Sequence, residues 1–390
     1  MKNLKSYEDH MRLLHDIEGG KARVITYGMT DTNHALLAKD FLSAENVVAN
    51  FDSNKNKWGQ KLSMGVTTMP LDAITEMSKK ADGIIIMADA VFQIGAYLET
   101  LGLSYCHGRL MNEKLPPRFI ERARIEKNKV AENADKLNKV RSLLADSRSQ
   151  IVYDSLITAR TTDNPHELYL SLCEIISDDQ YFPKFVPSFL PLKDEIFVDG
   201  GAYYGDTIQA LRKLGEEKRV YKHIYAFEPD PINFEILCQY VSDDPDITCY
   251  KKGLYSKDTF VEFFSDTVSY RSKIKEFVRE DRIFNNTYFS QWLSPGESIK
   301  IEACSIDNLI KDRVTFIKMD LEGSEPVALK GAENTIRLNK PKLAICIYHN
   351  IEDFWEIPLY IKEIVPEYKL YLGHHGIGFC CLETVLYALI

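Results

Sequence analysis

The sequence of 390 residues lacks the features that would place a protein in a membrane or outside the cell. No apolar run reaches the roughly 18 residues of a transmembrane helix, and residues 1–15 are too polar for a signal peptide. None of the eight cysteines forms a Cys-x-x-Cys pair, and several lie in apolar, strand-like runs. We therefore expect buried thiols, with neither disulfides nor a zinc site, in a cytoplasmic protein without a membrane span.

An excess of positive charge is also missing. The net charge is −9, with 48 Lys and Arg against 57 Asp and Glu, which argues against a partner bound through its phosphates. We expect no nucleic-acid partner. Apolar residues make up 45% of the chain, as in an ordinary globular protein, and the length suits two domains.

The most informative stretch is a strand, a glycine turn and a helix start at residues 196–211. The apolar strand ends at Asp199, glycines follow at 200, 201 and 205, and a helical pattern begins at Thr207. Glycines permit positive φ angles and let a ligand approach the backbone, while a new helix offers unpaired N–H groups. The spacing differs from the dinucleotide fingerprint, because three residues separate Gly201 from Gly205.

The next predicted strand, 223–227, ends in an acidic residue, Glu228. A carboxylate at this place is suited to two hydrogen bonds with a ribose diol. The glycine turn and the acid, within one βαβ unit, predict a pocket for an adenosine-type cofactor. The alternative is an ordinary α/β turn with a capping acid.

The chain divides into three regions. Strand-like runs at 23–27, 46–51 and 83–88 alternate with helical patterns, which predicts a parallel sheet. A charge-rich helical stretch follows, and then a second α/β unit ends in a hairpin formed by 368–372 and 383–389. We predict three domains. Residues 1–115 form a Rossmann-like α/β domain, residues 116–192 form a helical connector, and residues 193–390 form the second α/β domain.

Five segments of the last domain resemble the FkbM family of methyltransferases over roughly residues 180–390. The segments are Val198–Thr207, Phe227–Asn233, Ile317–Glu325, Leu329–Ala332 and Ile347–Asn350. The resemblance implies an α/β fold with a class I methyltransferase Rossmann-like sheet, a C-terminal antiparallel hairpin, and a smaller Rossmann-like domain and helical connector before it. It also implies transfer of a methyl group from S-adenosyl-L-methionine to a hydroxyl, usually of a sugar or a secondary metabolite.

The same resemblance implies the cofactor-binding residues. The glycine turn would hold the methionine part, Glu228 the ribose, and Asp230 and Asn233 would lie beside the adenine. An aromatic face attracts a cation, so Tyr203 or Tyr204 could face the sulfonium or simply pack in the core. The full predicted set is Asp199, Gly200, Gly201, Ala202, Tyr203, Tyr204, Gly205, Asp206, Thr207, Glu228, Pro229, Asp230 and Asn233.

Two further residues are predicted to be catalytic. Asp320 follows the strand 314–319 and His349 follows 342–347, so both belong at the carboxyl edge of the sheet. We predict His349 as the general base for the acceptor hydroxyl, with Asp320 orienting it or the cofactor. The alternatives are a backbone-bonded histidine, a helix N-cap at Asp320 and a first-turn carboxylate at Glu325.

A metal site is not predicted, because no ligand spacing demands one. Asp320, Glu322 and His349 would nevertheless offer the mixed oxygen and nitrogen ligands that suit magnesium, manganese or iron. The long segment 266–297 is predicted to carry acceptor specificity, or else to cover the sheet as helices.

The first region leaves other functions open. Its turn after the first strand has a single glycine, Gly28, and Asp52 closes the next strand, so it could bind a nucleotide or serve in docking or dimerisation. The main prediction is an O-methyltransferase acting on a sugar, nucleotide-sugar or polysaccharide precursor, and a homodimer is expected. The alternatives are an NAD-dependent nucleotide-sugar oxidoreductase and a non-catalytic scaffold.

Overall fold

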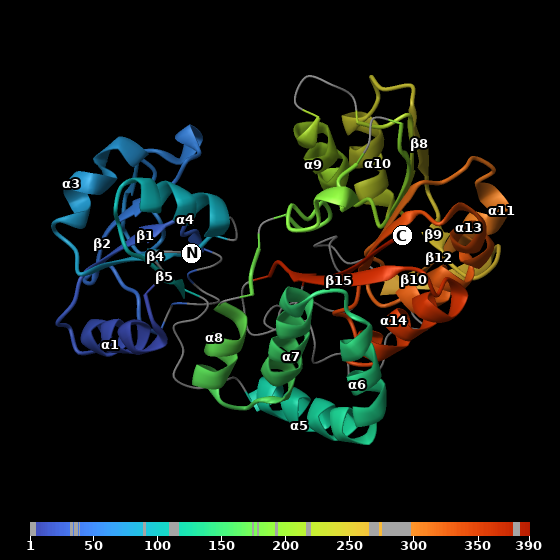
Figure 1. The fold of residues 1–390 in the computed structure, drawn as a ribbon. Coiled ribbons are helices and arrows are strands. Elements are labelled where there is room, and N and C mark those ends of the chain that lie inside the picture. Colours follow the sequence, from blue (N-terminus) through green and yellow to red (C-terminus); the bar gives the residue numbers. More distant parts are fainter. Residues whose placement is uncertain are drawn as a thin grey trace. The chain divides into compact units, whose positions relative to one another are not determined.

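The computed structural model describes residues 5–31, 34, 38, 40–88, 91–108, 117–173, 175–177, 179–191, 194–215, 220–264, 273–274, 298–376 and 383–390 (Figure 1). The chain forms two compact units, one of 1–121 with 162–174 and 377–380, the other of 122–161 with 175–376 and 381–390. The helices predicted as a connector are divided between these units. The domain limits 1–115, 116–192 and 193–390 stay a prediction.

The first unit contains a parallel sheet of the Rossmann type. Its strand order is β3-β2-β1-β4-β5, which matches the first five strands of the doubly wound order 3-2-1-4-5-6. The strands are β1 (Val24–Tyr27), β2 (Val47–Phe51), β3 (Thr68–Met69), β4 (Gly83–Ile86) and β5 (Cys106–His107). The three predicted strands are β1, β2 and β4, while β3 and β5 are too short to show a pattern in the sequence.

Helices complete this unit. α1 (Tyr7–Glu18) begins at Ser6, whose side chain accepts a hydrogen bond from the N–H of Asp9, a common N-cap arrangement. The ring of Tyr7 stacks on His166 of α8 (Pro165–Cys173), with centroids 4.8 Å apart. The remaining helices are η2 (Lys55–Lys57), η3 (Leu71–Ala73), α3 (Ile74–Ser78) and α4 (Val91–Thr100).

The second unit is built on a sheet of seven strands in the order β15-β16-β14-β13-β6-β7-β8. β16 is antiparallel to both of its neighbours, and the other pairs are parallel. The strands are β6 (Ile196–Gly200), β7 (His223–Phe227), β8 (Ile247–Tyr250), β13 (Phe316–Met319), β14 (Lys342–Cys346), β15 (Lys369–His374) and β16 (Thr384–Leu389). The predicted parallel sheet with a C-terminal hairpin is confirmed.

The second unit also contains a separate, smaller sheet of four strands. β10 (Thr259–Phe264) and β12 (Ser298–Cys304) pair with each other in antiparallel register, in the order β11-β10-β12-β9. The other two strands are β9 (Gly253–Leu254) and β11 (Lys273–Ile274). The proposed acceptor-binding segment, 266–297, lies outside the described residues apart from β11.

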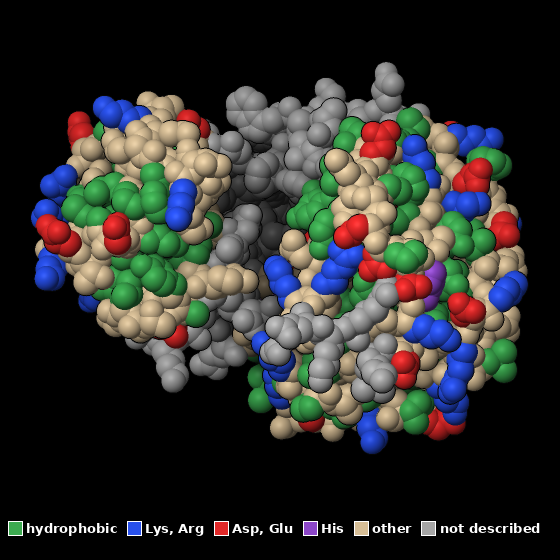
Figure 2. All heavy atoms as spheres, turned by 90° about the horizontal axis from the view of Figure 1, so that it is seen from above, with side chains coloured by type: hydrophobic (Ala, Val, Ile, Leu, Met, Phe, Trp, Pro, Cys, Tyr) green, Lys and Arg blue, Asp and Glu red, His purple; other side chains and the backbone are tan. Residues whose placement is uncertain are grey.

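Helices flank the large sheet. α9 (Asp206–Leu214) and α10 (Pro231–Tyr240) lie side by side (Figure 1). The further helices of this part are η5 (Pro187–Phe189), α11 (Ile306–Leu309), α12 (Glu325–Lys330), α13 (Glu333–Asn339) and α14 (Asp353–Ile364). None of the helices in the described part of the chain has the length and apolar character needed to cross a bilayer. On the face shown in Figure 2, acidic and basic side chains are interspersed over the coloured atoms.

Three helices precede the large sheet: α5 (Pro117–Glu132), α6 (Ala134–Leu143) and α7 (Ser147–Thr161). A buried ion pair joins α5 and α7. Arg160 of α7 donates to both carboxylate oxygens of Glu126 on α5, at 2.9 and 2.6 Å. Its third hydrogen bond, of 2.7 Å, reaches the carbonyl oxygen of Tyr348. Arg160 is 1% and Glu126 5% exposed, so this pair anchors the loop after β14.

We predict that Glu126→Ala lowers the free energy of unfolding by about 3–5 kcal/mol, because it removes the buried carboxylate that pairs with the charged Arg160. Asp154→Ala is the matched control. It removes the partner of Arg141 from a pair in which both side chains are nearly half exposed, and should cost less than about 1 kcal/mol. Urea denaturation followed by circular dichroism measures both losses. Equal losses would show that the buried pair does not stabilise this unit.

Candidate active site

Three neighbouring strands, β6, β13 and β14, end at the same edge of the second unit's sheet. Asp199 of β6 lies in register with Lys318 of β13. Asp320 comes directly after β13, and His349 comes shortly after β14. The parallel register therefore brings the glycine turn and both predicted catalytic residues to one edge.

The glycine turn passes very close to the loop after β13. Gly201 and Gly205 have φ angles of 73° and 93°, in the region that favours glycine. A Cβ atom on Gly201 would lie 2.0 Å from the carbonyl oxygen of Asp320. The N–H groups of Gly201 and Ala202 both donate to the Phe227 carbonyl, at 3.0 and 2.9 Å. The turn is thus held between the ends of β7 and β13.

A buried lysine, Lys318, holds this turn in place. Its Nζ donates to the carbonyl oxygen of Gly201 at 2.7 Å and lies 3.1 Å from Oδ1 of Asp199. Burial disfavours the charged ammonium, but Asp199 and Asp320 outweigh this effect and raise the pKa of Lys318 above its ordinary value. Lys318 is therefore a buried cation at neutral pH, and it links β6, the glycine turn and β13.

Glu228 lies next to the turn and is 6% exposed. Its Oε2 accepts from the N–H of Tyr203 at 2.9 Å, and its Oε1 from the N–H of Asp230 at 2.8 Å. Burial raises the pKa of Glu228 to about 8, although both hydrogen bonds oppose this shift. Because each carboxylate oxygen has two lone pairs, one acceptor site per oxygen is left for a ribose hydroxyl.

The other predicted cofactor residues differ in their surroundings. Asp230 is buried and caps α10, where Oδ1 accepts from the N–H groups of Ile232 and Asn233. Its carboxylate thus has a structural role, and Asn233 is buried beside it. The rings of Tyr203 and Tyr204 pack together with centroids 4.1 Å apart. The remaining members are Gly200 at the end of β6, Ala202 and Pro229 on the two turns, and Asp206 and Thr207 on the first turn of α9.

Asp320 is held by two tyrosine hydroxyls. Tyr181 donates to Oδ2 at 2.8 Å, and Tyr348 donates to Oδ1 at 3.0 Å. Burial by itself would raise the pKa of Asp320, but His349 and Lys318, together with the hydroxyls, lower it. Asp320 is therefore an ionised acceptor.

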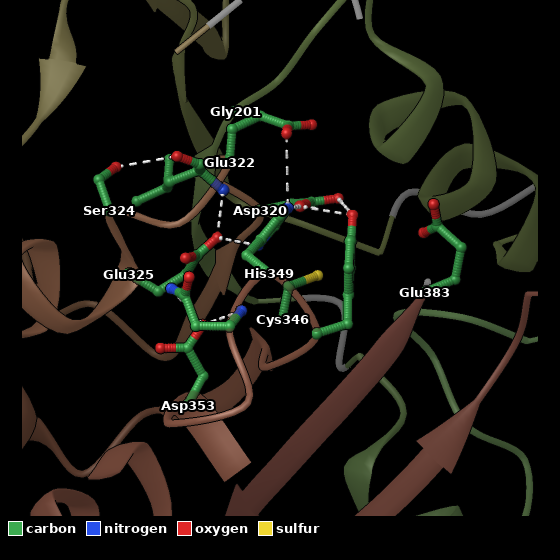
Figure 3. Close-up of polar contacts among 12 residues, drawn as sticks. Gly201, Asp320, Glu322, Ser324, Glu325, Cys346, His349, Asp353 and Glu383 are labelled. Carbon is green, nitrogen blue, oxygen red and sulfur yellow. Dashed lines mark hydrogen bonds and ion pairs between the residues drawn. The ribbon is translucent and has the colours of Figure 1, made fainter. Parts of the chain in front are cut away.

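His349 lies among three carboxylates (Figure 3). Its Nδ1 is 3.0 Å from Oε1 of Glu325, and its Nε2 is 3.5 Å from Oδ1 of Asp320 and 3.7 Å from Oε2 of Glu322. Burial would lower the pKa of His349, but these charges raise it to about 10. In this arrangement the imidazole carries a proton at neutral pH.

The structure bears on the alternatives for these residues. Ser324, not Asp320, is the N-cap residue of α12. The nitrogens of His349 donate to no backbone carbonyl of the described residues. Glu325 does begin α12, as a first-turn carboxylate should, but it is fully buried and its Oε1 accepts from the N–H of Leu321 at 2.6 Å.

Four residues of this site were not predicted from the sequence: Lys318, Tyr181, Tyr348 and Glu383. Lys318 could have been noticed in the sequence, because it is a single charged residue inside an apolar strand. The sequence around the two tyrosines offers no such indication. Glu383 accepts from the side chain of Gln180, and burial together with Asp320 raises the pKa of Glu383 to about 8. Figure 3 shows Glu383 apart from the cluster around His349.

Residues 199–374 match the model of the methyltransferase FkbM domain. A solved methyltransferase FkbM from Methylobacillus flagellatus KT has the same fold, with 19% identity, a TM-score of 0.53 and 98% of each chain covered. An rRNA methylase from Streptococcus thermophilus aligns with 51% of this chain and 87% of its own, at 14% identity and a TM-score of 0.31. No curated protein matches the sequence.

The chain therefore contains a methyltransferase FkbM domain. The predictions of a methyltransferase, of its class I fold and of S-adenosyl-L-methionine as its cofactor are confirmed. The residues present fit this cofactor on one observation. Oγ1 of Thr207 and Oδ2 of Asp199 are buried at the glycine turn without a hydrogen-bond partner.

We predict that Gly201→Ala abolishes binding of S-adenosyl-L-methionine. The new Cβ atom would lie 2.0 Å from the Asp320 carbonyl oxygen, so the turn and the loop after β13 must move apart. Gly65→Ala is the control, because Gly65 has a φ of 92° but open space around its Cβ position. Isothermal titration calorimetry on both folded variants measures the difference. Unchanged affinity in Gly201→Ala would rule out this turn as the cofactor site.

Proposed function

We propose that the protein transfers the methyl group of S-adenosyl-L-methionine to a hydroxyl of a sugar, a nucleotide-sugar or a polysaccharide precursor. The observation that carries the proposal is the placement of Asp320 and His349 beside the glycine turn, at the carboxyl edge of one parallel sheet. Cofactor and acceptor groups meet at this edge in open α/β sheets.

The bound sulfonium supplies an activated methyl group, so the chain's own residues mainly supply alignment. Placing two reactants in near-attack geometry can contribute about 7–11 kcal/mol to lowering the barrier. Lys318 and the Phe227 carbonyl hold the glycine turn rigidly. We infer that this turn orients the methionine part, while Glu228 accepts hydrogen bonds from the ribose.

A neutral hydroxyl is a weak nucleophile until its proton is removed. Asp320 is ionised and could accept this proton or orient the hydroxyl. His349 could act as the predicted base only in its neutral form, which the surrounding carboxylates disfavour. Its role as base therefore requires that part of this negative charge be offset.

Hydrogen-bond acceptors near the site support a methyl-accepting substrate with several hydroxyl groups. Asp320 and Glu322 offer carboxylate oxygens, and carboxylates bind hydroxyl donors with strong, charge-assisted hydrogen bonds. The resemblance to enzymes that methylate sugars points the same way. A homodimer, a cytoplasmic location and the lack of a nucleic-acid partner stay predictions.

Two observations disfavour an oxidoreductase reaction in the first unit. A Cβ on Gly28 would meet the Cβ of Ala88 at 2.5 Å, so packing alone explains this glycine. The carboxylate of Asp52 accepts from Nζ of Lys57 and from the N–H of Asn54. These contacts explain both residues by local structure, without a bound nucleotide.

We predict that affinity for S-adenosyl-L-methionine rises as the pH increases through about 8. The pKa of Glu228 is raised to about 8, and only the ionised carboxylate can accept a hydrogen bond from both ribose hydroxyls. Glu228→Gln, which does not titrate, should bind at least about tenfold more weakly, since a hydrogen bond to a charged group contributes about 1.5–3 kcal/mol. Calorimetric titrations between pH 6.5 and 9 test this.

The cofactor's own ionisation is the same for both proteins, so the difference between their pH profiles isolates Glu228. Glu302→Gln, a change at a half-exposed glutamate of β12, should leave the wild-type profile intact. Parallel profiles for wild type and Glu228→Gln would contradict the ribose role.

We predict that His349→Ala lowers turnover by at least about 10²-fold, the lower end of the range for a group that handles a proton, with little change in cofactor affinity. Release of S-adenosylhomocysteine over a panel of sugars and nucleotide-sugars measures turnover. His223→Ala, on β7 with its ring 3.0 Å from Thr248, is the control. Normal turnover in His349→Ala, or methylation confined to non-hydroxyl acceptors, would contradict the proposal.

A further inference from the structure

We propose that Asp320, Glu325 and His349 bind one divalent transition-metal cation. Each offers a ligand atom, and these atoms all lie within 4.8 Å of one another. Figure 3 shows the three side chains converging from the loop after β13, the start of α12 and the loop after β14. Ligand atoms at about 2.0–2.2 Å from a cation stand about 3–4 Å apart, so small side-chain shifts complete the site.

The unsatisfied atoms of this cluster are an independent observation that points to a cation. Glu325 is fully buried, and its Oε2 accepts no hydrogen bond. Both ring nitrogens of His349 are buried and lack hydrogen-bond geometry, although Nδ1 lies 3.0 Å from Oε1 of Glu325. Buried polar atoms without partners are costly. A cation between them would satisfy a carboxylate oxygen and a nitrogen at once.

The charge balance leads to the same site. Among the residues that the structure describes, Asp320 and Glu325 share the single imidazole of His349 as charged partner and form no ion pair with a lysine or arginine. The nearby buried lysine, Lys318, is already engaged by Asp199 and by the carbonyl oxygen of Gly201. A group of buried carboxylates is stable when it is paired or coordinates a metal.

The local backbone also gathers carboxylates at this point. Glu322 has a φ of 54° and Gly323 a φ of 99°, and a left-handed non-glycine residue is strained and typical of functional sites. The resulting turn brings Glu325 back to accept from the N–H of Leu321. Tyr181 and Tyr348 orient Asp320 by hydrogen bonds, as second partners of metal ligands commonly do.

The ligand set indicates the kind of cation. Two carboxylates and one imidazole suit manganese, iron or zinc, whereas calcium and magnesium prefer oxygen ligands. A bound cation would polarise an acceptor hydroxyl and would hold His349 as a neutral ligand. This last step rests on the proposed methyl transfer, but binding of the cation does not.

The test is titration of Mn²⁺ into the full-length protein after treatment with a chelator, without cofactor or acceptor. Free Mn²⁺ is followed by electron paramagnetic resonance, and thermal unfolding is recorded alongside. We expect one bound ion per chain and a higher melting temperature, since a ligand of the folded state stabilises it. His349→Ala, Glu325→Gln and Asp320→Asn should each weaken binding at least tenfold, whereas His223→Ala should bind like the wild type.

Each result decides the matter. A folded wild-type protein that binds no Mn²⁺ and shows no shift in melting temperature would overturn the site. Equal binding by the wild type and the folded variants at these three positions would place the ion elsewhere. If a variant fails to fold, the Mn²⁺ titration and the melting-temperature shift of the wild type still test whether a site exists. Metal binding without methyl transfer would sink the proposed function and leave the site standing.

Discussion

The buried ion pair between Lys318 and Asp199 is the interaction on which the site depends. Both side chains are almost fully buried, and such a pair survives in a protein interior only when further hydrogen bonds satisfy it. Lys318 finds one at the carbonyl oxygen of Gly201. The strand register that puts Lys318 opposite Asp199 therefore also fixes the glycine turn, which is the proposed cofactor-binding backbone.

The acceptor side of the site follows from the same register. Asp320 is two residues beyond Lys318, and its N–H donates to the Gly200 carbonyl at 3.1 Å, so the loop after β13 begins against the turn after β6. The next strand, β14, leads to His349, and Arg160 holds the carbonyl oxygen of the preceding Tyr348. Asp320 and His349 are thus placed beside the glycine turn by neighbouring strands and by a helix that lies earlier in the chain.

Local patterns allowed the sequence to predict much of this arrangement. The strand, glycine turn and helix start at 196–207 and the acid at Glu228 are close in sequence, and the fold places them as expected. The pairing of β10 with β12 could not be read, because it depends on strands far apart in the chain. The same holds for Arg160 and Glu126, and for Glu325 beside His349, whose protonation depends on neighbours brought together only by folding.

The charges around His349 have a consequence for methyl transfer. The positive charge on the sulfonium declines in the transition state, so unbalanced negative charge nearby stabilises the bound cofactor more than the transition state. Such stabilisation tightens binding without raising the rate. Asp320, Glu322 and Glu325 would have this effect if nothing offset them. A proton on His349 offsets one charge, whereas a divalent cation would offset two and would also polarise the acceptor hydroxyl. Either one occupies the ring nitrogen that a base would need. The proposed cation would therefore let this cluster combine tight cofactor binding with efficient transfer.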